Sequence, residues 1–365
     1  MRLLGHPRPD TYRVSMDLVS LDLSNHDHAE RYWRVRETAL SAGRPRYQPT
    51  ALEDFVELMA LPNDRFRRRV LGVMTRGSLL GAAMELIPTA PDPDAETIDG
   101  WVFPYVPPAY RNDGIGTLMM TELIGRAQAE GRTRMLSAVE FAGDNLMEAS
   151  RHPYVTFARS HGFEIGRRII RWELTLPLKP ETVTSFVQAG YPRLEGYRFA
   201  LFEGLPPAQW RDDLLALRAE SDAHDLVRGL SVDPEQTTGD FERTTQMWLG
   251  QGHRVVTAIA LCPQDRVVAL STVRVPPKPD FAATLQRATY VDEAHRRKRL
   301  APMLLVATAS WLARHAPERH HVQTATVEVD RKLASLSRAI GYEPIETMLR
   351  VARRVLPPEE EKPAK

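Results

Sequence analysis

Residues 106–117 read VPPAYRNDGIGT and join an apolar run to an amphipathic one. WVFPYV ends at Val106 and is typical of a buried strand, whereas LMMTELIGRAQAE begins at Leu118 and is typical of a helix. A strand that runs directly into a helix leaves the first helix N–H groups without intrahelical partners. The helix dipole adds partial positive charge at the same place. This junction therefore predicts a site that can bind an anion of the size of phosphate.

Three residues of the stretch favour that interpretation over a turn with no ligand. Gly114 and Gly116 allow the backbone to approach a ligand closely, because a Cβ there would stand in the way. Arg111 can add a charge-assisted contact to phosphate. The carboxylate of Asp113 would repel a bound anion unless it points away from the site. Short glycine motifs are common, so the stretch alone leaves the plain turn open.

The rest of the chain follows one plan twice, over residues 12–175 and 197–355. Each half has a short strand, an amphipathic helix, a pair of β-rich runs, a strand with a basic turn, and a long helix. A further strand, a helix that ends in Gly plus an aromatic residue, and a closing strand complete it. This order predicts an α/β fold in which each half is a mixed, mostly antiparallel twisted sheet with helices on both faces.

The boundary between the halves is expected in a segment rich in Pro and Gly. We predict an N-terminal domain over 1–178, a linker with room for one short helix over 179–196, and a C-terminal domain over 197–356. Residues 357–365 read PPEEEKPAK. They are charged and rich in Pro, which predicts a flexible tail.

Composition sets limits on the class of protein. The 365 residues carry 48 Lys plus Arg against 47 Asp plus Glu, and a net charge of +1 gives no reason to expect a nucleic-acid or membrane partner. No run of about 18 apolar residues predicts a membrane span. Cys262 is the only cysteine, so an intrachain disulfide is impossible. A single cysteine and an N-terminus without a signal-length apolar core predict a cytoplasmic protein without a cysteine-based metal site.

The first half resembles the GNAT superfamily of N-acetyltransferases. Its members carry Val-x-Pro-x-Tyr-Arg-x-x-Gly-x-Gly between a strand and a helix, and Val106 to Gly116 match that pattern. The resemblance implies that this loop binds the pyrophosphate of acetyl-CoA. The cofactor-binding residues expected here are Val106, Arg111, Asn112, Asp113, Gly114, Ile115, Gly116 and Thr117.

The second half looks like a diverged copy of the same motif. Residues 291–301 read VDEAHRRKRLA, in which Arg296 matches Arg111 while Arg299 and Ala301 replace the two glycines. The resemblance extends cofactor binding to Val291, Arg296, Arg297, Arg299 and Ala301. A solvated basic face and a nucleic-acid patch are the alternatives, and Asp292 and Glu293 argue against nucleic acid.

Candidates for acid and base chemistry are fewer than the resemblance implies. Acyl transfer to an amine needs a base, for which Asp99 and Glu140 are the candidates of the first half, with Glu96 beside Asp99. The usual tyrosine of the family is replaced by Ala158, and Tyr154 is the substitute candidate. In the second half Ser337 takes that place and no carboxylate precedes the motif.

The sequence thus predicts an acetyl-CoA-dependent N-acetyltransferase that acts on the amine of a small molecule by direct transfer, without a metal. The alternative is a catalytically degenerate protein that binds acyl-CoA or has a structural role. A protein acetyltransferase is a third, weaker interpretation. The two halves can form a pseudo-dimer within a monomer, or the chain can be a homodimer.

Overall fold

The computed structural model describes residues 16–60, 66–89, 99–224, 238–277, 283–328 and 331–356. The chain divides into two compact units, of which the first contains 1–42, 51–135 and 355–365 and the second contains 43–50 and 136–354. Each unit draws on both halves of the sequence, so the predicted boundary at 179–196 stays a prediction. That segment holds one helix, α6 (Pro180–Gly190), and a short 3-10 turn. The predicted tail lies outside the described residues.

The first unit contains a four-stranded antiparallel meander in the order β1-β2-β3-β4. These strands are β1 (Asp17–Leu21), β2 (Phe66–Thr75), β3 (Ser78–Pro88) and β4 (Asp99–Tyr105). Its helices are α1 (His26–Ser41), α2 (Leu52–Ala60) and α3 (Ile115–Ala129).

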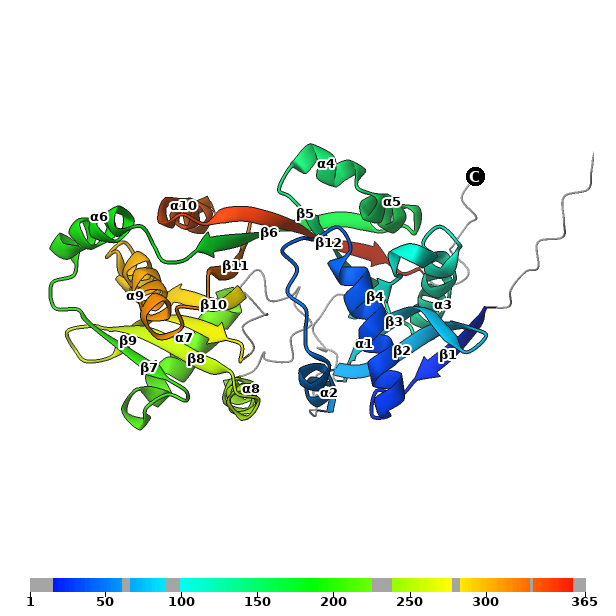
Figure 1. Cartoon of the computed structure of the whole chain (residues 1–365), viewed down its shortest axis with the longest axis horizontal. Helices are drawn as coiled ribbons and strands as arrows, with labels where there is room; N and C mark the ends of the chain where they lie inside the picture. The colour runs from blue at the N-terminus through cyan, green and yellow to red at the C-terminus, as the bar shows by residue number, and fades with distance from the viewer. Residues whose placement is uncertain are drawn as a thin grey trace, which may run out of the picture. The chain divides into compact units, whose positions relative to one another are not determined.

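Helices of the first unit cover opposite faces of this meander (Figure 1). Tyr32 of α1 packs edge-on against Tyr105 of β4, with ring centroids 6.2 Å apart. Tyr105 lies opposite Ala82 in the register of β3 and β4, so the neighbouring residue Gly81 points to the other face. A Cβ at Gly81 would lie 2.7 Å from Ile115 of α3. Helix α3, which begins at the predicted anion site, is therefore packed tightly against the centre of the sheet.

The second unit contains the strand order β5-β12-β6-β11-β10-β9-β8-β7. Only β10 and β11 are parallel among the pairs from β12 to β7. The strands are β5 (Arg134–Ala142, which begins in the first unit), β6 (Glu164–Thr175), β7 (Arg198–Glu203), β8 (Arg254–Leu261), β9 (Val267–Val275), β10 (Ala283–Val291), β11 (His321–Val327) and β12 (Glu343–Arg354).

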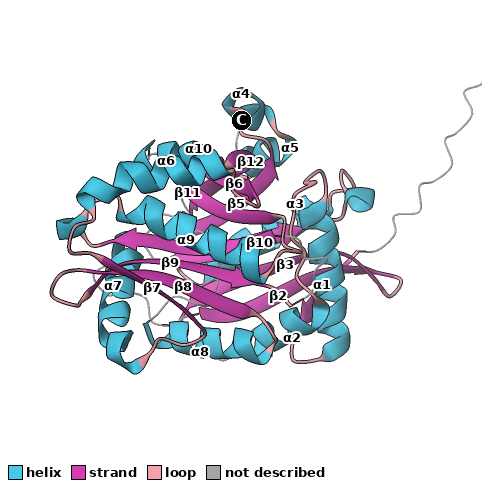
Figure 2. Ribbon diagram, turned by 60° about the vertical axis from the view of Figure 1, so that its left-hand side comes forward, coloured by secondary structure: helices cyan, strands magenta, loops and turns pink. Residues whose placement is uncertain are grey.

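Helices cover both faces of the second sheet as well (Figure 2). Besides α6 they are α4 (Leu146–Arg151), α5 (Pro153–Ser160), α7 (Arg211–His224), α8 (Thr238–Gly250), α9 (Leu300–His315) and α10 (Arg331–Ile340). Ala258 and Ala260 of β8 pack with Leu304 of α9, whereas Ile259 packs with Leu214 and Leu217 of α7. Burial of both faces explains why β8 reads as a nearly continuous apolar run. The predicted fold class is confirmed.

The closing strands are exchanged between the two halves of the sequence. β6, from the first half, pairs antiparallel with β11 and β12 of the second half, with Trp172 opposite Thr324 on one side and Pro344 on the other. The prediction that each closing strand completes its own half is wrong. Both strands are twelve residues long, and apolar residues alternate over part of each, as at Ile170, Trp172 and Leu174 of β6. Such a pattern specifies a face but not a partner.

Three helices escaped the sequence analysis. One is α4, and the other two are α2 and α8, which follow the first long helix of their half. Helix α2 reads LEDFVELMA and buries Phe55. Its apolar residues recur at positions i, i+3, i+4 and i+7, so the signal is present, but nine residues make it short.

His253, just before β8, predicts a pH dependence of stability. Burial, reinforced by Arg274 and Arg319, lowers the pKa of His253 from 6.5 to about 4. Between these two values the unfolded chain binds more protons than the folded one, so the free energy of unfolding should rise with pH from 4 to 6.5 and flatten above. The contribution is on the order of 1 kcal/mol per pH unit. We expect the free energy of unfolding, measured by urea titration at several pH values, to rise less steeply with pH in His253→Gln than in the wild type. An equal dependence on pH in the two proteins would contradict the assignment to His253.

Candidate functional site

The loop between β4 and α3 has the backbone of an anion cradle. A short 3-10 turn, Pro108–Tyr110, follows the strand. Asn112 and Gly114 then have positive φ angles of 69° and 81°. A Cβ at Gly114 would have no atom within 4 Å, so it is the left-handed φ and not crowding that favours glycine there.

The first turn of α3 keeps its amides clear of side-chain caps. Gly114 occupies the N-cap position, and it provides no side-chain cap. By contrast, Asn25, Asn145 and His152 cap α1, α4 and α5 with their side chains. Asp113, the carboxylate of concern, is exposed. The amides of Ile115, Gly116 and Thr117 are thus in position for an external acceptor.

Arg111 holds the loop in shape. Its Nε donates to the carbonyl of Val106 at 2.9 Å, and its Nη2 donates to the carbonyl of Ala39 in α1 at 3.3 Å. The first bond closes the turn that β4 leaves, and the second ties it to α1. The predicted contact between Arg111 and a phosphate would have to use an N–H that these two carbonyls do not occupy. Positioning the loop is the role that the geometry favours.

The loop between β10 and α9 repeats this geometry without glycine. A 3-10 turn, Glu293–His295, again follows the strand, and Arg297 and Arg299 have φ angles of 66° and 64°. Arg296 Nε donates to the carbonyl of Val291 at 3.3 Å, as Arg111 does to Val106. Helix α9 also begins without a side-chain cap. The alignment of the two motifs is therefore matched by their backbones.

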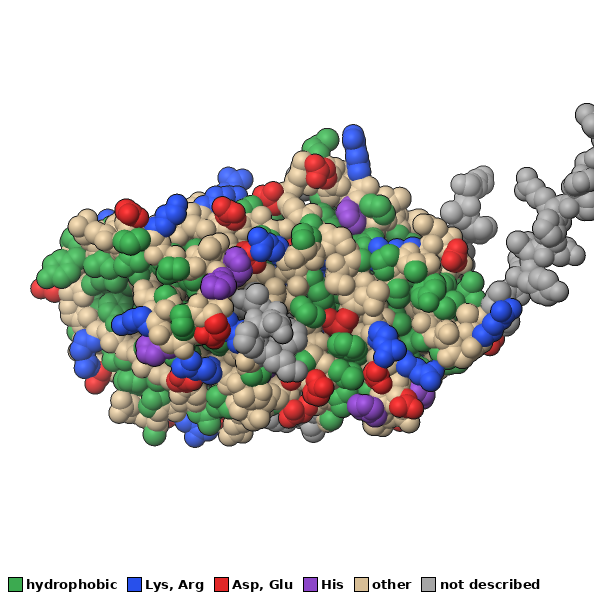
Figure 3. Space-filling view, in the orientation of Figure 1, with side chains coloured by type: hydrophobic (Ala, Val, Ile, Leu, Met, Phe, Trp, Pro, Cys, Tyr) green, Lys and Arg blue, Asp and Glu red, His purple; other side chains and the backbone are tan. Residues whose placement is uncertain are grey.

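Charge distinguishes the second loop from the first. Arg296, Arg297, Lys298 and Arg299 are all exposed. The neighbouring acids are used within the loop: Asp292 accepts from the amide of Ala294 at 2.8 Å, and Glu293 pairs with Arg296 at 3.3 Å. Elsewhere, basic and acidic side chains are interspersed on the face drawn in Figure 3. The second loop is a basic cluster above a helix N-terminus, which suits an anion.

Arg299 should cost stability because it is held in a left-handed conformation. A residue with a Cβ is disfavoured there by roughly 1 kcal/mol or more, whereas glycine is not. We expect Arg299→Gly to raise the free energy of unfolding by about 1 kcal/mol in urea titrations. Lys298→Gly, which removes the same charge at a position without positive φ, should lower it. A loss of stability in Arg299→Gly equal to that in Lys298→Gly would show that φ is not the cause.

The predicted catalytic carboxylates are both ion-paired. Asp99 accepts two hydrogen bonds from Arg134, at 2.7 and 2.6 Å, and these bonds raise the pKa of Arg134. Glu140 contacts Arg44 at 2.5 Å and Arg171 at 3.7 Å. Both oxygens of Asp99 accept from Arg134, whereas the two cations beside Glu140 both contact its Oε2. Glu140 is kept as the candidate base of the two.

Tyr154 lies in α5, where it packs edge-on against His152 with ring centroids 4.5 Å apart. His152 in turn stacks on Phe141 of β5 at 4.4 Å. Ala158, at the usual tyrosine position, is buried. Tyr154 is thus half-buried in an aromatic cluster, where its hydroxyl role stays a prediction. Glu96 lies outside the described residues.

The sequence analysis missed a buried arginine. Arg44 has a side chain 2% exposed and bonds Glu346 through Nε at 3.2 Å and Nη2 at 2.7 Å, besides contacting Glu140. These contacts raise the pKa of Arg44. Arg44 and Glu346 are 302 residues apart, so no spacing in the sequence could have paired them.

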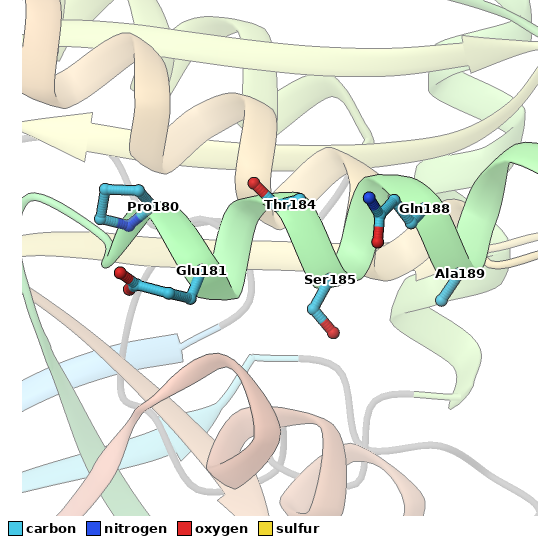
Figure 4. Close-up of a pocket in the computed structure, with 6 residues that line it drawn as sticks. All are labelled: Pro180, Glu181, Thr184, Ser185, Gln188 and Ala189. Carbon is cyan, nitrogen blue, oxygen red and sulfur yellow. The ribbon is translucent and has the colours of Figure 1, made fainter.

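A shallow hollow of about 680 Å³ lies elsewhere, along α6 (Figure 4). Its lining residues all come from this helix: Pro180, Glu181, Thr184, Ser185, Gln188 and Ala189. None of them belongs to either loop, and the hollow adds nothing to the candidate site.

Comparison with solved structures shows the same fold in a tandem GNAT protein and in a GCN5-related N-acetyltransferase. The chain is similar to a tandem GNAT protein from the clavulanic acid biosynthesis pathway, with a TM-score of 0.72 and 19% identity over 94% of this chain and 99% of that one. It is also similar to a GCN5-related N-acetyltransferase from Sphaerobacter thermophilus, with a TM-score of 0.60 and 15% identity over 94% and 96%. No protein-family model and no curated protein matches the sequence.

The chain therefore has the fold of tandem GNAT proteins, as the motif at 106–116 implied. At these identities the likeness concerns the fold. In the described part of the chain, no group of three or more His, Cys, Asp or Glu side chains could hold a metal ion. No helix among the described residues is long and apolar enough to cross a membrane.

Proposed function

We propose that the protein is an acetyl-CoA-dependent N-acetyltransferase with its principal cofactor loop between β4 and α3. The observation that carries this proposal is the uncapped first turn of α3 behind the left-handed Gly114. A pyrophosphate needs several N–H donors aimed at one point, and this backbone supplies them together with the positive end of the helix dipole.

Residues of this chain would position the reactants more than they would activate them. Direct transfer joins the amine nitrogen to the acetyl carbon and breaks the C–S bond, while the proton lost by the amine goes to a base and the thiolate takes up another. Glu140 is the proposed base, which requires that its contacts with Arg44 and Arg171 loosen. Tyr154 is the proposed donor to the thiolate. Holding two reactants together can supply much of the rate by itself.

The second loop is proposed as a second anion site of lower affinity. Arg297 and Arg299 reproduce the left-handed positions of Asn112 and Gly114, and the loop has more positive charge. Bulky side chains at those positions, however, leave less room for a ligand against the amides of α9. We propose that the first unit carries the main site.

A thiol-release assay with acetyl-CoA and a panel of small amines tests the activity. Sustained release of free thiol that depends on the amine is the expected result. Binding of acetyl-CoA without release for any amine would favour the alternative, a degenerate protein that has kept cofactor binding. Glu140→Gln should reduce the rate by about a hundredfold if Glu140 is the base. An unchanged rate would remove Glu140 from the mechanism.

A further inference from the structure

A band of charged side chains crosses four neighbouring strands of the second unit, β5, β12, β6 and β11. The segment Gly43–Thr50 runs across them as a strap. Arg44 of this strap contacts Glu140 of β5 and Glu346 of β12. Arg46 contacts Glu173 of β6, and its carbonyl accepts from Gln323 of β11. Arg44 and Arg46 thus anchor the strap to the four strands by polar contacts.

Donors and acceptors balance at the β5 end of this band. Arg44 bonds Glu346 with two of its nitrogens, and Arg171 lies 3.5 Å from Glu346 and 3.7 Å from Glu140. Two guanidinium groups therefore serve two carboxylates, which leaves this end with no unmet charge.

Acceptors outnumber donors at the β11 end. Glu173 has a side chain only 7% exposed, and its Oε2 accepts from Gln323 Nε2 at 2.9 Å. The nitrogens nearest to its Oε1, from Arg46 and His321, are each 3.4 Å away. These distances exceed those of ordinary N–H···O hydrogen bonds. Among the described residues, Oε1 of this nearly buried carboxylate therefore has only two longer ion-pair contacts.

Gln323 adds a second acceptor to the same place. Its Nε2 donates to the carbonyl of Arg46 and to Glu173, and two acceptors on one atom fix the orientation of the amide. The carbonyl oxygen Oε1 consequently points away from both, and no described residue donates to it. Gln323 is 1% exposed, where an unsatisfied acceptor is costly.

Glu343 brings further negative charge. The register places Glu343 of β12 directly opposite Glu173 of β6, so both side chains leave the same face of the sheet. Like charges opposite each other on neighbouring strands are destabilising. Arg46, the cation that faces Glu173, has a side chain 52% exposed, and its contact with Glu173 is 3.4 Å long.

We propose that Glu173, Gln323 and Glu343 form a binding site for a primary ammonium group of the acceptor, distinct from the amine whose proton Glu140 takes. An ammonium has three N–H donors and no acceptor, which is the complement of this set. It would displace the loosely held Arg46 side chain, beside the partly exposed ring of His321. Naming the ligand as the acceptor rests on the proposed function; the site itself rests on the contacts above.

Calorimetric titration of the full chain with n-butylammonium chloride, without acetyl-CoA, tests the site. We expect saturable binding that Glu173→Gln weakens at least tenfold, the loss typical of a charge-assisted bond. Arg46→Ala should tighten binding, because it removes the competing cation from a half-exposed position. Glu328→Gln, the same change at a carboxylate paired with Arg168 at 2.9 Å, is the control and should leave binding unchanged.

Equal affinities of wild type, Glu173→Gln and Arg46→Ala would overturn the proposal, as would binding of 1-butanol as tight as that of the ammonium. Absence of wild-type binding up to the solubility limit would overturn it as well. Thermal melts establish that each variant is folded. Because the titration contains no acetyl-CoA, its outcome is independent of acetyl transfer. Amine binding without thiol release would contradict the proposed function but support the ammonium site. Thiol release that Glu173→Gln does not change would support the proposed function but contradict the role of the site in binding the acceptor.

Discussion

Acetyl-CoA should bind the Gly116→Trp variant at least about a hundredfold more weakly than the wild type, a loss of roughly 2.7 kcal/mol. Gly116 is the second residue of α3, and an indole there would cover the amides on which the proposed pyrophosphate site depends. Isothermal titration calorimetry measures the change directly. Gly116 is half-buried between the buried Ile115 and the exposed Thr117, so a thermal melt of the variant accompanies the titration to establish that it is folded.

The second loop supplies the matched control. Ala301 occupies the position of Gly116 in the second motif, and it is likewise the second residue of its helix, α9. Ala301→Trp should leave the high-affinity binding of acetyl-CoA to the first loop unchanged. If Ala301→Trp abolished binding and Gly116→Trp did not, the principal site would belong to the second loop. If both variants bound as the wild type does, neither loop would hold the cofactor.

Removing the guanidinium of Arg44 should cost about 3–5 kcal/mol of unfolding free energy. Arg44→Met would leave Glu346, whose side chain is 3% exposed, without its bidentate partner. Arg171, 3.5 Å from Glu346, would then be the cation left beside it. A buried carboxylate that has lost its hydrogen bonds is far less stable than a hydrogen-bonded one. Unfolding in urea, followed by tryptophan fluorescence, gives the difference.

Two further variants separate the buried charge from the loss of the arginine itself. Arg34→Met breaks a pair of similar length, 2.7 Å to Glu30, in which the side chains are 68% and 37% exposed. It should cost no more than about 0.5 kcal/mol. Arg44→Met combined with Glu346→Leu should recover much of the loss, because no buried charge is then left alone. A double variant as unstable as Arg44→Met would mean that packing, not charge, is the cause.

The sequence predicted what is local. The loop at 106–117 could be interpreted because a strand, two glycines and a helix lie next to one another in the chain. Most helices and strands followed from apolar periodicity, and β8 was recognised from its continuous run. The left-handed angles of Arg297 and Arg299 could be expected only from the alignment of the two motifs, since arginine itself argues against them.

What the sequence did not predict depends on partners far apart in the chain. β6 pairs with β11 and β12, and nothing in its alternating pattern distinguishes them from strands of its own half. Arg44 lies between Gly43 and Pro45 in a polar stretch and resembles a solvated loop residue, yet it is buried against Glu346. Burial of this kind arises from tertiary contacts that composition does not encode.

A crystal structure of the protein with acetyl-CoA tests the central claim most directly. We predict that the diphosphate oxygens lie within hydrogen-bond distance of the amides of Ile115, Gly116 and Thr117, with Arg111 still bound to the carbonyl of Val106. A cofactor bound away from the first turn of α3, or a first turn whose amides are bonded to protein atoms while the cofactor is present, would contradict the account.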